Sequence, residues 1–106
     1  YTSVPPLKMA TYSASNAGLN ALSRALAKEW GPYNITVNAV APGVIATENM
    51  TKRLTPEEIK EKCESKIALC RPGTPEEIAE VVLNTVNTPY MTGEIVNING
   101  GVWFPA

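Results

Sequence analysis

The feature that most constrains this sequence is one long amphipathic helix, predicted over residues 11–30. Large apolar side chains recur there at spacings of three and four residues, which places them on one helix face: Leu19, Leu22, Leu26 and Trp30. A second, narrow stripe of alanines lets a sheet or another helix come close: Ala17, Ala21 and Ala25. The helix is expected to end at Gly31 and Pro32, because glycine and proline both interrupt helices.

Tyr12 lies in the first turn of this predicted helix. A tyrosine at the start of a rigid helix is a candidate for chemistry. The alternative is that Tyr12 is an ordinary half-buried aromatic, and the helix pattern alone favours this second interpretation because most aromatic side chains pack rather than react.

Composition excludes several classes of function. The chain has 106 residues, which suits one domain or part of one. The nine lysines and arginines are scattered and the net charge is −1, so no nucleic-acid surface is expected. No apolar stretch approaches the roughly 20 residues of a membrane helix. With no histidine, and with Cys63 and Cys70 at a spacing that fits no metal site, we expect no bound metal and two reduced thiols in a cytoplasmic protein.

The order of elements predicts an α/β fold. Residues 35–41 are β-branched and mostly apolar, as in a buried strand of a parallel sheet, and residues 94–99 form a similar closing strand. Residues 55–58 and 74–77 both read Thr-Pro-Glu-Glu, a capping box that should start helices over 56–66 and 75–86. The second of these helices carries apolar side chains expected to face inward: Ile78, Val81, Val82 and Leu83. The predicted order is loop–α–β–loop–α–α–β, followed by an apolar tail.

Four segments resemble motifs of the short-chain dehydrogenase/reductase family. They are the tyrosine motif at residues 12–18, the Asn-x-x-x-Pro-Gly-x-Ile-x-Thr segment at 38–47, the Arg-x-Gly-x-Pro-x-Glu-Ile-Ala helix start at 71–79, and the closing Thr-Gly…Asn-Gly-Gly strand at 92–101. Each motif alone is weak, but the four occur in the family's order and spacing over nearly the whole chain. The sequence is most similar to members of the classical type, such as 3-oxoacyl-[acyl-carrier-protein] reductases.

The resemblance implies the C-terminal half of a Rossmann-type, doubly wound parallel sheet. Residues 1–106 would then be part of an NAD(P)-binding domain whose Gly-rich N-terminal half is absent from this sequence, which opens on Tyr1 as if it began mid-protein. The implied reaction is hydride transfer between the nicotinamide of NAD or NADP and a small-molecule carbonyl or alcohol. The implied assembly is a homo-oligomer, or a complex with a partner chain that supplies the missing half.

The resemblance also assigns the catalytic residues. Tyr12 takes the position of the family's proton donor and acceptor, and Ser3 that of the serine that orients the substrate carbonyl. The family lysine, one helical turn after the tyrosine, is replaced here by Asn16. An amide can still bind the ribose hydroxyls of the cofactor, but it cannot supply the charge that stabilises a tyrosinate. Ser3 also lies closer to Tyr12 than the family serine does.

The other implied cofactor contacts follow the first strand. Pro42, Gly43 and the backbone of Ile45 would face the nicotinamide ring, and Thr47 would contact its carboxamide or phosphate. Taken without their neighbours, Pro42 and Gly43 are equally well explained as a simple turn that ends the strand.

Two functions are therefore expected to compete. The first is an NAD(P)-dependent oxidoreductase, of which the isolated 106 residues would be inactive. The second is a catalytically degenerate fragment that acts as a structural or oligomerisation piece, which Asn16 and the missing half favour.

Overall fold

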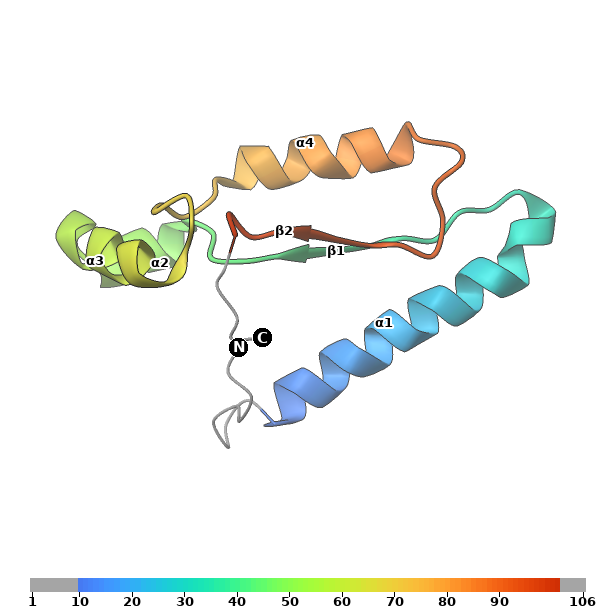
Figure 1. The fold of residues 1–106 in the computed structure, drawn as a ribbon, viewed down its shortest axis with the longest axis horizontal. Coiled ribbons are helices and arrows are strands. Elements are labelled where there is room, and N and C mark those ends of the chain that lie inside the picture. Colours follow the sequence, from blue (N-terminus) through green and yellow to red (C-terminus); the bar gives the residue numbers. More distant parts are fainter. Residues whose placement is uncertain (1–9, 102–106) are drawn as a thin grey trace. The chain divides into compact units, whose positions relative to one another are not determined.

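A computed structural model describes residues 10–101 of the chain (Figure 1). The elements in order are α1 (Ala10–Trp30), the 3-10 turn η2 (Gly31–Tyr33), β1 (Ala39–Pro42), α2 (Glu48–Arg53), α3 (Pro56–Lys66), α4 (Pro75–Val86) and β2 (Ile95–Ile98). This mixture of helices and paired strands confirms the predicted α/β class. The described residues divide into two compact units, one formed by residues 10–39 and 88–96 and the other by 40–87 and 97–101.

The two strands pair side by side in a parallel sheet, as predicted. The Ala39 N–H donates to the Glu94 carbonyl and the Gly43 N–H to that of Ile98, both at 2.9 Å, so the two strands advance together. The first strand is shorter than the predicted 35–41. Ile35 is 47% exposed, and residues 35–38 have strand-like composition but no ladder within the described sheet.

The first unit consists of α1 and the segments that follow it. Asn34 ends the helical stretch in a left-handed conformation (φ 62°), and its N–H donates to the Gly31 carbonyl. The side chain of Asn38 then holds the return segment, because its Nδ2 donates to the Met91 carbonyl at 3.0 Å and its Oδ1 accepts from the Glu94 N–H at 3.1 Å. The motif asparagine thus fixes the entry to β2.

The second unit has its buried centre at the end of α3. Cys63, on the inward face of α3, is 1% exposed, and Ile67, the residue that caps the end of this helix, is 4% exposed. Both predicted capping boxes are present, with Thr55 and Thr74 as the N-caps. The predicted bounds of α3 and α4 are confirmed because a threonine cap followed by proline marks a helix start clearly.

Two predictions about this unit are wrong. The connection between the first strand and the helix at 56–66 was expected to be a loop, but Glu48–Arg53 within it form the short helix α2. This helix has Thr47 as its cap and lacks an apolar period that would reveal it. Val82 and Leu83 were expected to face inward, but they are 42% and 62% exposed. A two-stranded sheet is too narrow to cover all the apolar side chains of α4.

Within residues 10–101, none of the helices combines the length and the apolar character that crossing a membrane requires.

Candidate functional site

The structure distributes the predicted site residues over its two units. Tyr12 lies in the first turn of α1 and Asn16, which is exposed, follows one turn later in the first unit. Ser3 and the side chain of Tyr12 lie outside the described part of the structure. The remaining predicted residues come together in the second unit, at the end of β1 and on the loop that follows it: Pro42, Gly43, Ile45 and Thr47.

Backbone hydrogen bonds to Ile98 and Gly73 fix the loop of residues 43–47. The Gly43 N–H donates to Ile98 O at 2.9 Å. Gly73 forms a parallel bridge with Ile45, in which the Gly73 N–H donates to Val44 O at 2.9 Å and Gly73 O accepts from the Ala46 N–H at 2.8 Å. A loop held by backbone bonds on both sides presents its remaining polar groups in a fixed geometry.

Gly43 is required by a close approach within the chain. A Cβ atom placed on Gly43 would lie 2.7 Å from the Cβ and 2.8 Å from the Cα of Asn99. From the sequence, Gly43 was explained by a sharp turn or by the approach of a ligand. The contact with Asn99 could not be predicted, because only the fold brings the end of β2 to this point. Gly43 therefore allows the end of β1 to pack against the end of β2.

Two polar groups of the loop have hydrogen-bonding capacity that the described residues do not use. The N–H of Ile45 has no acceptor among the residues that the structure describes. The hydroxyl of Thr47 caps α2 by accepting from the Met50 N–H at 3.3 Å, and its side chain is exposed. A hydroxyl that accepts one bond can still donate its own proton. The loop thus offers one backbone donor and one hydroxyl donor, two positions apart.

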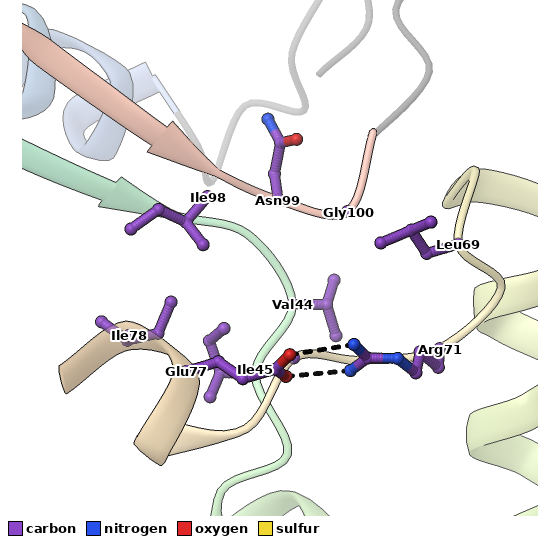
Figure 2. Close-up of a pocket in the computed structure, with 10 residues that line it drawn as sticks. Val44, Ile45, Leu69, Arg71, Glu77, Ile78, Ile98, Asn99 and Gly100 are labelled. Carbon is purple, nitrogen blue, oxygen red and sulfur yellow. Dashed lines mark hydrogen bonds and ion pairs between the residues drawn. The ribbon is translucent and has the colours of Figure 1, made fainter. Parts of the chain in front are cut away.

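A small cavity of about 90 Å³ lies beside this loop (Figure 2). Its lining consists mainly of apolar side chains and also includes one arginine and one glutamate. The lining residues are Val44, Ile45, Leu69, Arg71, Gly73, Glu77, Ile78, Ile98, Asn99 and Gly100. A larger cavity of about 270 Å³ on the same unit is lined by apolar residues together with Arg53, Lys62 and Lys66. Val44 lines both cavities, so the loop borders two hollows of this unit.

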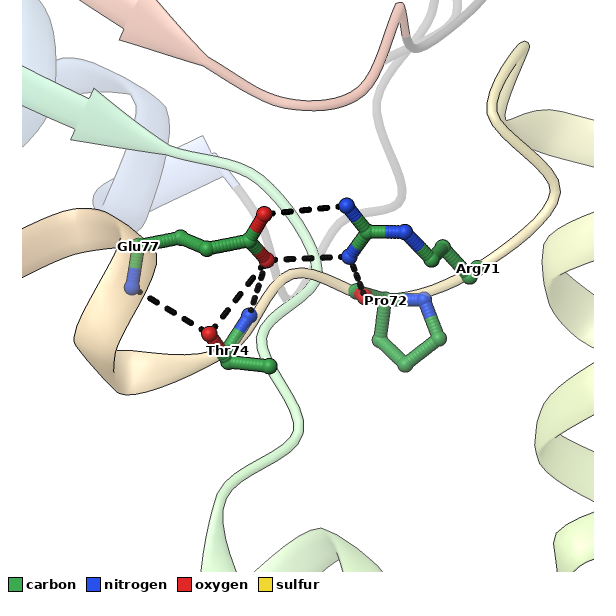
Figure 3. A network of polar contacts seen from close by, with 4 residues as sticks. All are labelled: Arg71, Pro72, Thr74 and Glu77. Atoms are coloured by element: carbon green, nitrogen blue, oxygen red, sulfur yellow. Dashed lines mark hydrogen bonds and ion pairs between the residues drawn. The ribbon is translucent and has the colours of Figure 1, made fainter.

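The ion pair is a two-pronged contact between Arg71 and Glu77 (Figure 3). Nη1 and Nη2 of Arg71 donate to Oε1 and Oε2 of Glu77, each at 2.9 Å. Glu77 Oε1 also accepts from the Thr74 N–H at 3.0 Å and from the Thr74 hydroxyl at 3.3 Å. The Arg71 guanidinium, followed by the Thr74 N–H, lowers the pKa of Glu77 to about 2, and the same carboxylate raises the pKa of Arg71.

Sequence reasoning missed this pair. It assigned Glu77 to the capping box of α4 and Arg71 only to a family motif. Arg71 and Glu77 share no helix or strand, because Pro72 and Gly73 interrupt the chain between them, so only the turn through these two residues brings the side chains together.

Known proteins match most of this chain. A family model described as "Enoyl-(Acyl carrier protein) reductase" matches residues 3–103. The 3-oxoacyl-[acyl-carrier-protein] reductase FabG of Aquifex aeolicus is 49% identical over 94 residues, which are 87% of this chain and 37% of that protein. Carbonyl reductase family member 4 of Danio rerio is 45% identical over 91 residues, 86% of this chain and 36% of that protein. The chain thus spans little more than a third of the length of these relatives.

Solved structures show the same fold. The RhlG/NADP active-site complex of Pseudomonas aeruginosa matches with a TM-score of 0.80 and 35% identity, over 93% of this chain and 41% of that one. An NADPH-bound short chain oxidoreductase from Pseudomonas aeruginosa PAO1, described as containing an atypical catalytic center, matches with a TM-score of 0.80 and 28% identity, over 89% of this chain and 39% of that one. The two paired strands with their helices are therefore a partial Rossmann-type sheet.

Proposed function

The chain belongs to the short-chain dehydrogenase/reductase family of oxidoreductases, and we propose that it forms the C-terminal, nicotinamide-facing part of an NAD(P)-dependent enzyme. The substrate would be a small carbonyl compound or alcohol, and the bound cofactor would supply or accept the hydride. Two of the solved neighbours carry NADP or NADPH in their names, which supports this class of cofactor.

The observation that carries the proposal is the loop of residues 43–47 after β1, whose conformation is fixed by backbone hydrogen bonds. Its backbone is fixed by Ile98 on one side and Gly73 on the other, while the Ile45 N–H has no acceptor within residues 10–101. In this arrangement the Ile45 N–H and the Thr47 hydroxyl would bind the polar edge of the nicotinamide. Pinned donors of this kind bind without a further cost of ordering the loop.

The proton would be moved by Tyr12, which gives its hydroxyl proton to the carbonyl oxygen in reduction and takes it back in oxidation. The rigid α1 fixes the backbone of Tyr12 and places Asn16 one turn further along the helix. Asn16 would bind the ribose hydroxyls, and Ser3 would orient the substrate carbonyl. The two free cysteines suit a reducing compartment, so we place the protein in the cytoplasm.

The test uses this chain fused behind the N-terminal part of its Aquifex aeolicus relative, with NADH and NADPH binding measured by calorimetry. We expect the fusion to bind a dinucleotide and Thr47→Val to weaken binding about tenfold, the usual effect of losing one hydrogen bond to a ligand. Thr51→Val is the matched control, because the Thr51 hydroxyl is bonded to Glu48 O within the same short helix. A fusion that folds but binds neither dinucleotide would refute the proposal.

A second candidate function is that of a structural piece without catalysis. Asn16 and the exposed apolar side chains of α1 and α4 favour it. Asn16→Lys in the same fusion separates the two candidates, with Asn20→Lys, one turn further along α1, as the matched control. If Asn16 is a disabled lysine, Asn16→Lys alone should raise reductase turnover at least about tenfold, because the new charge stabilises a tyrosinate. Turnover that is absent in all three forms would support the structural role.

A further inference from the structure

The Arg71–Glu77 pair bonds the two chain neighbours of Gly73, one of the residues that hold the loop after β1. The guanidinium binds both carboxylate oxygens at 2.9 Å, and its Nη1 also donates to the Pro72 carbonyl at 3.1 Å. The carboxylate binds the N–H and the hydroxyl of Thr74. The pair therefore closes a ring of contacts with Pro72 and Thr74, which flank Gly73 in the chain (Figure 3).

Gly73, between Pro72 and Thr74 in the chain, contacts the loop through both of its backbone polar groups. Its N–H donates to Val44 and its carbonyl accepts from Ala46. An added Cβ on Gly73 would lie 3.1 Å from Ile45 Cδ1 and 3.9 Å from Glu77 Oε1. The side of Gly73 that would carry a Cβ therefore faces both the side chain of Ile45 and the carboxylate of Glu77.

The capping box of α3 shows that the ion pair does more than start a helix. Thr55 and Glu58 make the same reciprocal cap contacts at 3.0 and 3.2 Å without an arginine. The pKa of Glu58 is lowered chiefly by its hydrogen bonds with Thr55, whereas that of Glu77 is lowered first by Arg71. The two hydrogen bonds from Arg71 to Glu77 are thus additional to the cap, and they connect the cap to the turn that contains Gly73.

We propose that the Arg71–Glu77 pair is a positioning device for residues 43–47, acting through the backbone bridge of Gly73. Both residues are positioning residues, because they act through Gly73. The proposal rests on the proposed function only for what the loop binds. Its structural part, that the pair sets the conformation in which the Ile45 N–H is presented, stands by itself.

Amide hydrogen exchange in the 106-residue chain tests that structural part. Arg71→Ala should speed exchange at the Ala46 and Gly73 amides about tenfold or more, because charge-assisted bonds in two-pronged geometry are lost. Arg71→Lys, which keeps the charge without the fork, should be intermediate. Glu58→Gln is the matched control: it removes the corresponding cap carboxylate on α3 and should leave both amides as in the wild type.

A purely local role in starting α4 predicts a different pattern. Exchange would then rise at the Glu77 and Ile78 amides, which bond to Thr74, and stay unchanged at Ala46 and Gly73 in both Arg71 variants. That result would overturn the proposal.

The dinucleotide-binding fusion supplies the functional readout. Arg71→Ala should raise the KM for the dinucleotide and leave kcat unchanged, the signature of lost uniform binding, whereas Glu58→Gln should change neither. A fusion that binds no dinucleotide refutes the proposed function, and the exchange data still decide whether the pair positions the loop.

Discussion

At the scale of single residues, Gly43 is the position where the backbone leaves least room. Its neighbour Asn99 is within 2.8 Å of any added Cβ, and part of that contact is backbone, which cannot rotate away. Gly43→Ala should therefore destabilise the chain by about 1–3 kcal/mol, the usual cost of overpacking a close contact. Urea unfolding, read as a shift in midpoint at constant slope, measures this.

Gly18 is the matched control for that substitution. It lies inside α1 with nothing within 4 Å of an added Cβ. Gly18→Ala should stabilise the chain by about 0.5–1 kcal/mol, because alanine loses less conformational freedom in a helix. Equal midpoints for Gly43→Ala and wild type would show that the ends of β1 and β2 do not pack as described.

At the scale of elements, the start of α4 should depend on pH through Glu77. Its pKa in the folded chain is about 2, below the ordinary value of 4.5, so the stabilisation is fully present above pH 4.5 and is lost as the pH falls through about 2. The difference in unfolding midpoint between wild type and Glu77→Gln should thus be constant from pH 7 to about 5. It should disappear near pH 2.

Arg71→Ala provides the cross-check for this titration. Without the guanidinium, which is the largest cause of the lowered pKa, the loss of stability should begin at higher pH. The Glu77 side chain is 44% exposed, so added salt should also reduce the wild-type difference. A difference that persists unchanged to pH 2 would contradict the assignment.

Elements differed in how far the sequence revealed them. The bounds of α3 and α4 were predictable because a Thr-Pro-Glu-Glu cap is local chemistry. The strand predicted at 35–41 began too early, because a ladder needs a partner strand and β2 begins only at Ile95. The loop carrying Ile45 and Thr47 was predictable from its motif, but the Arg71–Glu77 fork and the contact of Gly43 with Asn99 depend on segments that meet only in the folded chain.

At the scale of the whole molecule, much apolar surface is exposed. Side chains more than half exposed occur on both long helices: Leu19 and Leu22 on α1, Leu83 and Val86 on α4. The two strands of the described sheet also have one unpaired edge each. The isolated chain should therefore self-associate, with a sedimentation coefficient that rises with concentration.

Charges placed on α4 test that expectation. Leu83→Lys combined with Val86→Lys should reduce association, whereas Glu80→Lys, a change of charge at an exposed polar position of the same helix, should not reduce it to the same extent. A compact monomer at all concentrations would show that this surface does not drive association.

The pairing of β1 with β2 also sets the order in which the molecule is built. The strands join positions about 55 residues apart, and three helices lie between them. Such non-local pairing forms slowly, whereas the capped helices α3 and α4 can form from local contacts. During synthesis, Gly43 leaves the ribosome long before its acceptor Ile98. The loop of residues 43–47 therefore reaches its final conformation only after Ile98 has been made.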